Sequence, residues 1–276
     1  MTVRVTALGS GDAFGGAGRH ASCWLLRDAA GAALVDVGPG VLQGLYRAGV
    51  DPGAIAAVHF THLHGDHLAG WPFLLLDQAR RARRTDPLAV TGPPGTQGRL
   101  HALWAACYAD TAQRPLPFVI SITELSPGES LEVAGRTVHA LRAQHQRPPH
   151  VALSLRLHTS GGVLAFTGDT GPHEGLVALA AGARALFAEC SELEARTEVT
   201  VGAALEQAQP GHAAIGRRHL AWSDLRALLP LLEVRDVALT HLGAAPRAAR
   251  ARLEAEGAAL GKNLTVCDDG TTLHLD

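Results

Sequence analysis

The sequence lacks the features by which a chain crosses a membrane, enters the secretory route or attracts polyanions through its overall charge. None of its apolar runs approaches the roughly 20 residues that a bilayer crossing needs. The opening MTVRVTALGSG has no basic start, apolar stretch and cleavage site of a signal peptide, so we expect a cytoplasmic protein without a membrane partner. A formal net charge of -2 and an isoelectric point near 6.7 give no general attraction to nucleic acid.

Cysteine is also scarce, with 4 in 276 residues. Neighbouring cysteines stand about 80 positions apart, which fits neither a close-spaced zinc knuckle nor a dense disulfide framework. We therefore expect all of them to be small buried apolar residues: Cys23, Cys107, Cys190 and Cys267.

The chain does contain enough apolar material for one large core, since 47% of its 276 residues are hydrophobic. No linker, low-complexity tract or repeat interrupts it. Strand-like runs followed by helix-like segments occur in the first half and again in the second. We expect a single domain over residues 1–276 with two pseudo-symmetric halves, roughly 1–135 and 136–276. Its α/β fold would pack two sheets together with helices outside.

Periodicity places several elements more narrowly. Residues 151–157 alternate apolar and polar side chains, as in a strand with one covered face. Helices are expected over about residues 67–84 and 97–108, with a short strand at 88–91 between them. An apolar stripe over residues 225–232 indicates a helix packed on a core, which Pro230 must kink or end.

Residues 60–70, FTHLHGDHLAG, crowd three histidines and an aspartate into a short segment: His62, His64, Asp66 and His67. The segment follows the strand-like run IAAVHF and turns into a helix, so several side chains can point into one cleft at a sheet edge. Neutral imidazoles and carboxylates are good ligands for zinc and similar metals. Because four ionisable groups this close are costly to desolvate without a cation, the motif predicts a metal site.

Further ligand candidates stand at the ends of other predicted strands. They are His145 in RAQHQ, Asp169 in FTGDT and His241 in ALTHLG. His150 follows His145 in the same loop and is the alternative ligand there. Other histidines that can border the cleft are His20, His173 and His212.

The order and type of these residues resemble the metallo-β-lactamase fold superfamily. In that superfamily an H-x-H-x-D-H motif, a later His, an Asp in a G-D-T turn and a final His build a two-metal site, and Asp36 in LVDVGPG completes the pattern. The resemblance extends over nearly the whole chain. It implies a four-layer αββα sandwich of two mixed β-sheets with outer helices. It also implies two divalent metal ions, with zinc expected and manganese or iron as alternatives.

The resemblance further implies a role for each residue. The residues that would hold the first metal are His62, His64 and His145. The residues that would hold the second metal are Asp66, His67 and His241. Asp169 would bridge the two metals, and Asp36 would orient the cluster by hydrogen bonds, as ligating imidazoles require. Such a pair of metals makes hydroxide available at neutral pH, so we expect hydrolysis by a metal-bound hydroxide.

Two segments resemble the ribonuclease Z and phosphodiesterase branch of the superfamily. LGSGDAFGGAGRHASCWLL is similar to that branch's glycine-rich opening, and HLAWSDLRALLPLLEVRDVALTH places His219 22 residues before His241. A histidine there is expected to protonate the leaving oxygen, a task that suits imidazole near neutral pH. We therefore expect Asp66 and His219 to be catalytic residues, with Glu189 orienting His219.

Two departures separate the chain from ribonuclease Z. HLA stands where that family usually has His-Ser-Thr, and the 23 residues between His145 and Asp169 leave no room for a long tRNA-gripping arm. We therefore expect the substrate to be a small or cyclic phosphodiester, and Arg147 to be a local phosphate clamp.

Several alternatives stay open at this point. A tRNA 3'-processing endonuclease would make nucleic acid the partner, and a thioester or lactone hydrolase would use the same ligands. A di-iron oxidoreductase expects a Glu in place of the motif's second His, and a non-catalytic relative would have lost ligands. The basic run at residues 80–84 either contacts phosphates or lies solvated at a helix C-terminus. A homodimer is expected from the resemblance alone.

Overall fold

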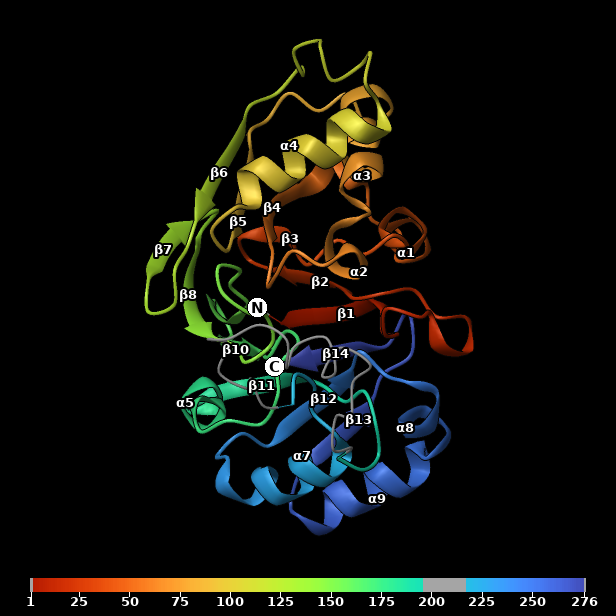
Figure 1. Cartoon of the computed structure of the whole chain (residues 1–276), viewed down its shortest axis with the longest axis vertical. Helices are drawn as coiled ribbons and strands as arrows, with labels where there is room; N and C mark the ends of the chain where they lie inside the picture. Colours follow the sequence, from red (N-terminus) through yellow and green to blue (C-terminus); the bar gives the residue numbers. More distant parts are fainter. Residues whose placement is uncertain (1, 196–216, 276) are drawn as a thin grey trace, which may run out of the picture.

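The computed structural model describes residues 2–195 and 217–275, and in it the strands form two mixed seven-stranded sheets. The sheets lie face to face in the middle of the molecule, and helices cover both outer faces (Figure 1). The predicted four-layer αββα sandwich is therefore confirmed.

The first sheet contains, in spatial order, β14 (Thr272–Leu275), β1 (Val3–Gly9), β2 (Cys23–Asp28), β3 (Gly31–Val35), β4 (Ile55–His59), β5 (Leu88–Gly92) and β6 (Ile120–Glu124). Its strands from β14 to β3 pair antiparallel, and those from β3 to β6 pair parallel. The short strand expected at residues 88–91 is β5, and it is confirmed.

The second sheet contains, in spatial order, β13 (Asn263–Val266), β12 (Asp236–Thr240), β11 (Ala183–Glu189), β10 (Gly162–Phe166), β9 (Leu153–Thr159), β8 (Arg136–Arg142) and β7 (Ser130–Val133). Strands β7 to β10 pair antiparallel, and β10 to β13 pair parallel. The sheets do not divide the chain at residue 135, because β7 already belongs to the second sheet and β14 returns to the first.

The helices over the first sheet are α1 (Val41–Arg47), α2 (Gly65–Leu68), α3 (Trp71–Arg80) and α4 (Thr96–Cys107). Those over the second sheet are α5 (Gly175–Ala180), α7 (Trp222–Leu228), α8 (Ala244–Ala248) and α9 (Arg250–Ala259). Short 3-10 turns are η1 (Gly16–Gly18), η2 (Pro52–Ala54) and η3 (Leu229–Leu231). The helix expected at 97–108 is α4, and Pro230 ends α7 as predicted because it falls in η3. No helix within the described ranges is long and apolar enough to span a bilayer.

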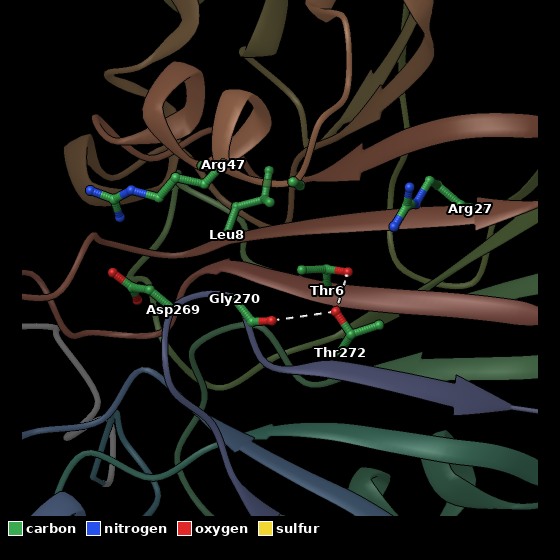
Figure 2. Close-up of a pocket in the computed structure, with 9 residues that line it drawn as sticks. Thr6, Leu8, Arg27, Arg47, Asp269, Gly270 and Thr272 are labelled. Carbon is green, nitrogen blue, oxygen red and sulfur yellow. Dashed lines mark hydrogen bonds between the residues drawn. The ribbon is translucent and has the colours of Figure 1, made fainter.

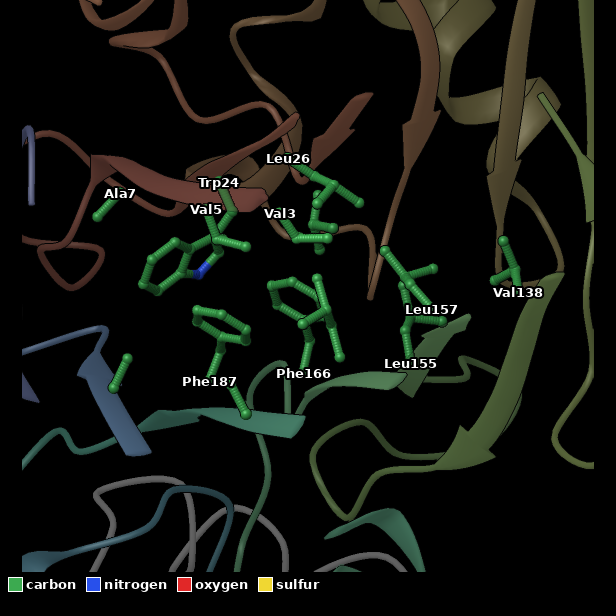
Figure 3. Packing of buried hydrophobic residues seen from close by; sticks show 14 of the residues in the cluster. Val3, Val5, Ala7, Trp24, Leu26, Val138, Leu155, Leu157, Phe166 and Phe187 are labelled. Carbon is green, nitrogen blue, oxygen red and sulfur yellow. The ribbon is translucent and has the colours of Figure 1, made fainter. Parts of the chain in front are cut away.

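Alternation along the strands divides the apolar side chains between an inner core and two outer ones. In β2, Trp24 and Leu26 point between the sheets, whereas Leu25 faces the helices. Trp24 meets Phe187 edge-on at 4.8 Å between ring centroids, and Phe187 stacks on Phe166 at 4.5 Å (Figure 3). Such aromatic pairs contribute about 0.5–1.5 kcal/mol each beyond the burial of their area. This inner core joins the two sheets into one body whose edge carries the site.

The single helix predicted over residues 67–84 is wrong, because the structure divides it into α2 and α3. The chain turns at Gly70, where a Cβ atom would lie 2.2 Å from the Gly38 carbonyl oxygen. The Gly70 N–H instead donates to the Val37 carbonyl at 2.9 Å, and Pro72 in the first turn suits the start of α3. This close approach brings the motif helix α2 against the end of β3.

The basic run at residues 80–84 does not act as one unit, either in contacting phosphates or in lying solvated at a helix C-terminus. Arg84 is buried, and its guanidinium donates to the carbonyl oxygens of Gly53, Ile55, Asp86 and Pro87 at 2.5–2.9 Å. It therefore ties the end of this helical segment to the start of β4. The other arginines of the run are exposed.

The expectation that every cysteine is buried holds for Cys23, Cys190 and Cys267 and is wrong for Cys107, which is exposed. Cys107 is the last residue of α4, and the apolar face of that helix is formed by Leu100 and Trp104 instead. The remaining cysteines pack in the cores as small apolar residues, and burial raises the pKa of Cys23.

Candidate metal centre

The predicted ligands leave strands whose carboxyl ends meet at one edge of the two sheets. β3 pairs parallel with β4, and β10 and β12 both pair parallel with β11, so their C-terminal ends point the same way within each sheet. Asp36 and His241, directly after β3 and β12, adopt left-handed backbone conformations with φ of 60° and 51°. Residues held in this sparsely populated region need support from their surroundings and gather at functional sites.

A first group of three imidazoles gathers with its ligand atoms within 4.8 Å of one another: His62, His64 and His145. The His64 Nδ1 atom lies 3.1 Å from His62 Nε2 and 2.9 Å from His145 Nε2. Around tetrahedral zinc with Zn–N bonds of about 2.0–2.1 Å, neighbouring ligand atoms lie about 3.3 Å apart. The three nitrogens therefore need only a small adjustment to hold one such ion.

A second group, equally compact, contains two carboxylates and two imidazoles: Asp66, His67, Asp169 and His241. Asp66 Oδ2 lies 3.3 Å from both His67 Nε2 and His241 Nε2. Asp169 approaches the same two nitrogens at 3.3 Å through Oδ1 and at 3.2 Å through Oδ2. These spacings also match the distances between neighbouring ligands of a tetrahedral zinc.

Asp169 lies between the two groups. Its Oδ2 atom is 3.8 Å from His62 Nε2 and 3.8 Å from His145 Nε2, while both its oxygens contact the second group. The side chain is 3% exposed and therefore buried between the two groups, with His219 Nδ1 a further 3.9 Å from Oδ2. This is the position that a carboxylate shared by two metals would take.

The protonation of the two groups differs. Burial lowers the pKa of His62 well below its ordinary value and that of His145 to about 4, so these imidazoles are neutral, the form that binds metal. Burial also opposes the charge of His67, but the carboxylates of Asp169 and Asp36 outweigh it and raise its pKa well above the ordinary value. A divalent cation bound there would displace this proton.

Asp36 supports the second group without touching its centre. Its Oδ2 atom lies 2.8 Å from His67 Nδ1, and the same carboxylate accepts hydrogen bonds from the backbone N–H and the hydroxyl of Thr61, each at 2.8 Å. Because Nδ1 is engaged, His67 presents Nε2 to the site. An outer carboxylate that fixes a ligating imidazole in this way also increases its basicity.

His219 lies at the open side of the cluster, with its side chain 37% exposed. Its Nδ1 atom is 2.9 Å from Glu189 Oε2 and 3.9 Å from Asp169 Oδ2. Glu189 is buried, and burial raises its pKa. Its Oε2 atom also accepts the Ser191 hydroxyl at 2.8 Å, and its Oε1 atom accepts the Thr170 N–H. A fixed carboxylate therefore orients the His219 ring beside the cluster.

One structural observation supports metal binding without any appeal to the sequence motif. Among the residues that the structure describes, His67 Nε2 and Asp169 Oδ1 are buried without a hydrogen-bond partner, although they lie 3.3 Å apart. Buried polar atoms without partners are rare and costly. A cation between them would satisfy both, and the mixed imidazole and carboxylate ligands suit zinc or a similar divalent ion.

The other candidate residues in the sequence do not belong to either ligand group, as far as the structure describes them. His150, the alternative to His145, is exposed and belongs to neither group. Arg147 is half-buried two residues beyond His145, and its role as a phosphate clamp stays a prediction. His20 and His173 are partly buried outside both groups, and His212 lies outside the described residues.

Sequence reasoning missed two hydroxyl residues that hold the supporting carboxylates. Thr61 donates to Asp36 through its backbone and side chain, and its only signal in the sequence is its place directly before the motif. Ser191 donates to Glu189 from two positions further along the chain, and no pattern singles it out. Both contacts depend on how the strand ends are folded together.

Comparisons with known proteins agree with this geometry. The family described as beta-lactamase superfamily domain matches residues 33–242, a span that contains every ligand named above. The ribonuclease Z of Mycobacterium bovis (strain BCG / Pasteur 1173P2) is 33% identical over 193 residues, which cover 67% of this chain and 69% of that protein.

Two solved structures are similar over nearly the whole chain. The short form of human tRNase Z superposes with a TM-score of 0.71 at 22% identity and covers 99% of both chains. A diphosphatase from the PhnP family superposes with a TM-score of 0.70 at 14% identity and covers 98% of this chain and 97% of its own. At these identities the structures show a common fold. Together with the family match and the clustered His and Asp ligands, they establish that the chain belongs to the beta-lactamase superfamily, as a hydrolase of the metallo-β-lactamase fold.

Proposed function

We propose that the protein is a dinuclear metal-dependent phosphodiesterase acting on small or cyclic phosphodiesters. The observation that carries the proposal is the position of His219, partly exposed and oriented by Glu189 beside Asp169. A thioester hydrolase also needs the metal ligands, but its thiolate leaving group has little need of protonation, whereas the alkoxide that leaves a phosphodiester does need it. An imidazole held at the edge of the site suits that task.

The two ligand groups would hold two divalent ions, with zinc expected. His62, His64 and His145 would hold one, the group around Asp66 the other, and Asp169 would bridge them. When bound, such a pair supplies Lewis acidity toward phosphoryl oxygens and makes hydroxide available from water near neutral pH.

The remaining steps belong to the chain itself. Glu189 engages Nδ1 of His219, so the proton for the leaving oxygen would come from the other ring nitrogen, Nε2. Asp66 is the more exposed of the two cluster carboxylates, 13% against 3% for Asp169, and would orient the attacking water as well as bind metal. Arg147 would contact the phosphate from the loop that carries His145.

The short length of the segment between His145 and Asp169 supports a small substrate. This stretch contains only a short loop and the hairpin β9–β10, whose strands are joined by residues 160 and 161. No arm that could embrace a tRNA fits into it. A single hydrolase domain, a cytoplasmic location and a homodimer, as expected from the sequence, are parts of the same proposal.

A second candidate is tRNA 3'-processing, because the ribonuclease Z of Mycobacterium bovis is 33% identical over 193 residues. The two candidates predict different substrate preferences from the same ligands. If the protein processes tRNA, His219 would act on the phosphodiester of a precursor tRNA.

The test is a hydrolysis screen of the zinc-loaded protein against cyclic nucleotides, bis(p-nitrophenyl) phosphate, a precursor tRNA, and thioester and lactone panels. We expect small phosphodiesters to be cleaved and His219→Ala to lower their kcat about 10²–10⁴-fold with unchanged zinc content. His158→Ala, an exposed histidine of β9, is the matched control and should keep full activity. Faster cleavage of precursor tRNA would support the second candidate. Equal activity in His219→Ala, or cleavage confined to thioesters or lactones, would contradict both.

A further inference from the structure

Thr170 is buried in the turn that follows β10, and its hydroxyl reaches a second loop of the site. The hydroxyl accepts the backbone N–H of Gln144 at 2.9 Å. The neighbouring Gly171 N–H donates in return to the Gln144 carbonyl at 2.9 Å. Because Gln144 immediately precedes His145, these two bonds fix the part of the loop that carries this imidazole.

The same short turn holds the carboxylate that orients His219. The Thr170 N–H donates to Glu189 Oε1, while Glu189 Oε2 lies 2.9 Å from His219 Nδ1. Gly171 packs so closely against the next segment that a Cβ atom there would lie 1.6 Å from the Arg217 carbonyl oxygen. Only glycine therefore fits at this position without displacing the backbone two residues before His219.

The loop of His145 and the segment of His219 also contact each other directly. The His145 Nδ1 atom lies 3.0 Å from the Arg218 carbonyl oxygen, so the ring presents Nε2 to the first ligand group. Arg218 directly precedes His219 in the chain. A displacement of the His145 loop would therefore move both a candidate metal ligand and the backbone next to His219.

We propose that Thr170 is a positioning residue, whose hydroxyl fixes His145 and, through the Arg218 carbonyl, also His219. The consequence for leaving-group protonation rests on the proposed function of His219, whereas the placement of His145 does not. Valine has nearly the shape of threonine but offers no acceptor, so Thr170→Val would leave the Gln144 N–H without its partner. The cost of such an unpaired N–H corresponds to about 5- to 150-fold in an equilibrium constant.

The test combines competition for zinc with a chromogenic chelator and imidazole ¹⁵N NMR spectra of the zinc-loaded protein. Thr170→Val should weaken one zinc ion about tenfold or more. The ring signals that change should be those of His145 and His219, with those of His67 and His241 unchanged. The kcat for bis(p-nitrophenyl) phosphate should fall by a similar factor. Thr170→Ser keeps the hydroxyl and should restore the wild-type values.

The matched control is Thr6→Val on the outer face of the first sheet. Thr6 is buried, and its hydroxyl lies 2.8 Å from that of Thr272 in a polar cavity between β1, β2, β14 and the end of α1 (Figure 2). Its chain neighbours Val5 and Ala7 point the other way, into the core between the sheets. Thr6→Val also removes a buried hydroxyl, and we expect it to change neither zinc binding nor the ring signals.

Amide spectra show whether each variant is folded. If Thr170→Val does not fold, Gly171→Ala takes its place, because its methyl group would displace Arg217 and should change the same two ring signals; unchanged signals there would overturn the proposal. So would wild-type zinc affinity in folded Thr170→Val, equal weakening of both zinc ions, or a Thr170→Ser variant as impaired as Thr170→Val. If the wild type cleaves no phosphodiester, the proposed function fails, but zinc binding and the ring signals still decide the role of Thr170.

Discussion

The substitution Asp36→Asn tests how far the second metal group depends on a residue that would touch neither metal nor substrate. Asn is nearly the same size and tolerates the left-handed backbone conformation of this position, φ 60°, so the turn should survive. One side-chain oxygen remains to accept the Thr61 N–H. The other acceptor becomes an amide NH₂ group, which cannot accept a hydrogen bond from His67 Nδ1.

The magnitude follows from the loss of the His67 contact, because the Thr61 hydroxyl, which also donates to Oδ2, can rotate and accept from the new amide group. His67 Nδ1 lies 2.8 Å from Asp36 Oδ2, both side chains are almost fully buried, and no water can replace the lost partner easily. A hydrogen bond to a charged group is worth about 1.5–3 kcal/mol, which corresponds to about 10- to 150-fold in affinity. Outer residues of metal sites typically change metal affinity about 10–100-fold, so the two estimates agree. We expect this loss for one of the two metals only, because the imidazoles of the first group do not contact Asp36.

The assay is competition for zinc between the protein and a chromogenic chelator. Wild type should show two tight zinc ions per chain, and Asp36→Asn should retain one and weaken the other. Asp51→Asn is the matched control, since the exposed Asp51 carboxylate accepts the Gly53 N–H at the start of η2, belongs to neither ligand group and should not affect zinc. Two zinc ions bound with wild-type affinity in Asp36→Asn would refute the reasoning.

Removal of metal with a chelator should abolish hydrolysis and lower the thermal midpoint, because the cluster would then be buried without its cation; an unchanged midpoint would count against a structural contribution of the metals. Arg84→Ala should lower the free energy of unfolding in urea by about 3 kcal/mol or more, because it leaves several buried carbonyl groups unpaired, whereas exposed Arg80→Ala should have little effect. Burial lowers the pKa of His59 from 6.5 to about 3, so the unfolded chain binds the extra proton first and stability present above pH 6.5 is lost as the pH falls toward 3. His59→Gln should therefore remove up to ~1.4 kcal/mol per pH unit from this slope in the metal-free protein, and a parallel pH–stability curve would contradict the assignment.

Features encoded over a few residues were predictable. The spacing of His62, His64, Asp66 and His67 directly after a strand predicted that these side chains gather with other ligand candidates, and they do, while alternation over residues 151–157 predicted a strand. Pro230 predicted the end of α7. Ligand type, strand period and turn chemistry are properties of neighbouring residues, so the sequence alone is enough to identify them.

Features that depend on packing between distant segments were not. The break between α2 and α3 exists because Gly70 packs against the Gly38 carbonyl, and Arg84 is buried because backbone carbonyls surround it. In both places local periodicity continues smoothly. Tertiary contacts override it, since a steric limit or several buried hydrogen bonds outweigh helix propensity, which amounts to only ~0.5 kcal/mol per residue.

By itself the sequence determined the chemistry available at this site: which residues can bind metal, and that a histidine precedes the last ligand. Only the tertiary structure decided how they meet. Asp66 and His241 lie 175 positions apart yet 3.3 Å from each other, and Glu189 reaches His219 across 30 positions. The loop after β8 turns His145 inward and leaves His150 exposed. The reason is physical, because interactions at such separations are set by the pairing and twist of two whole sheets and by the inner core that holds them together.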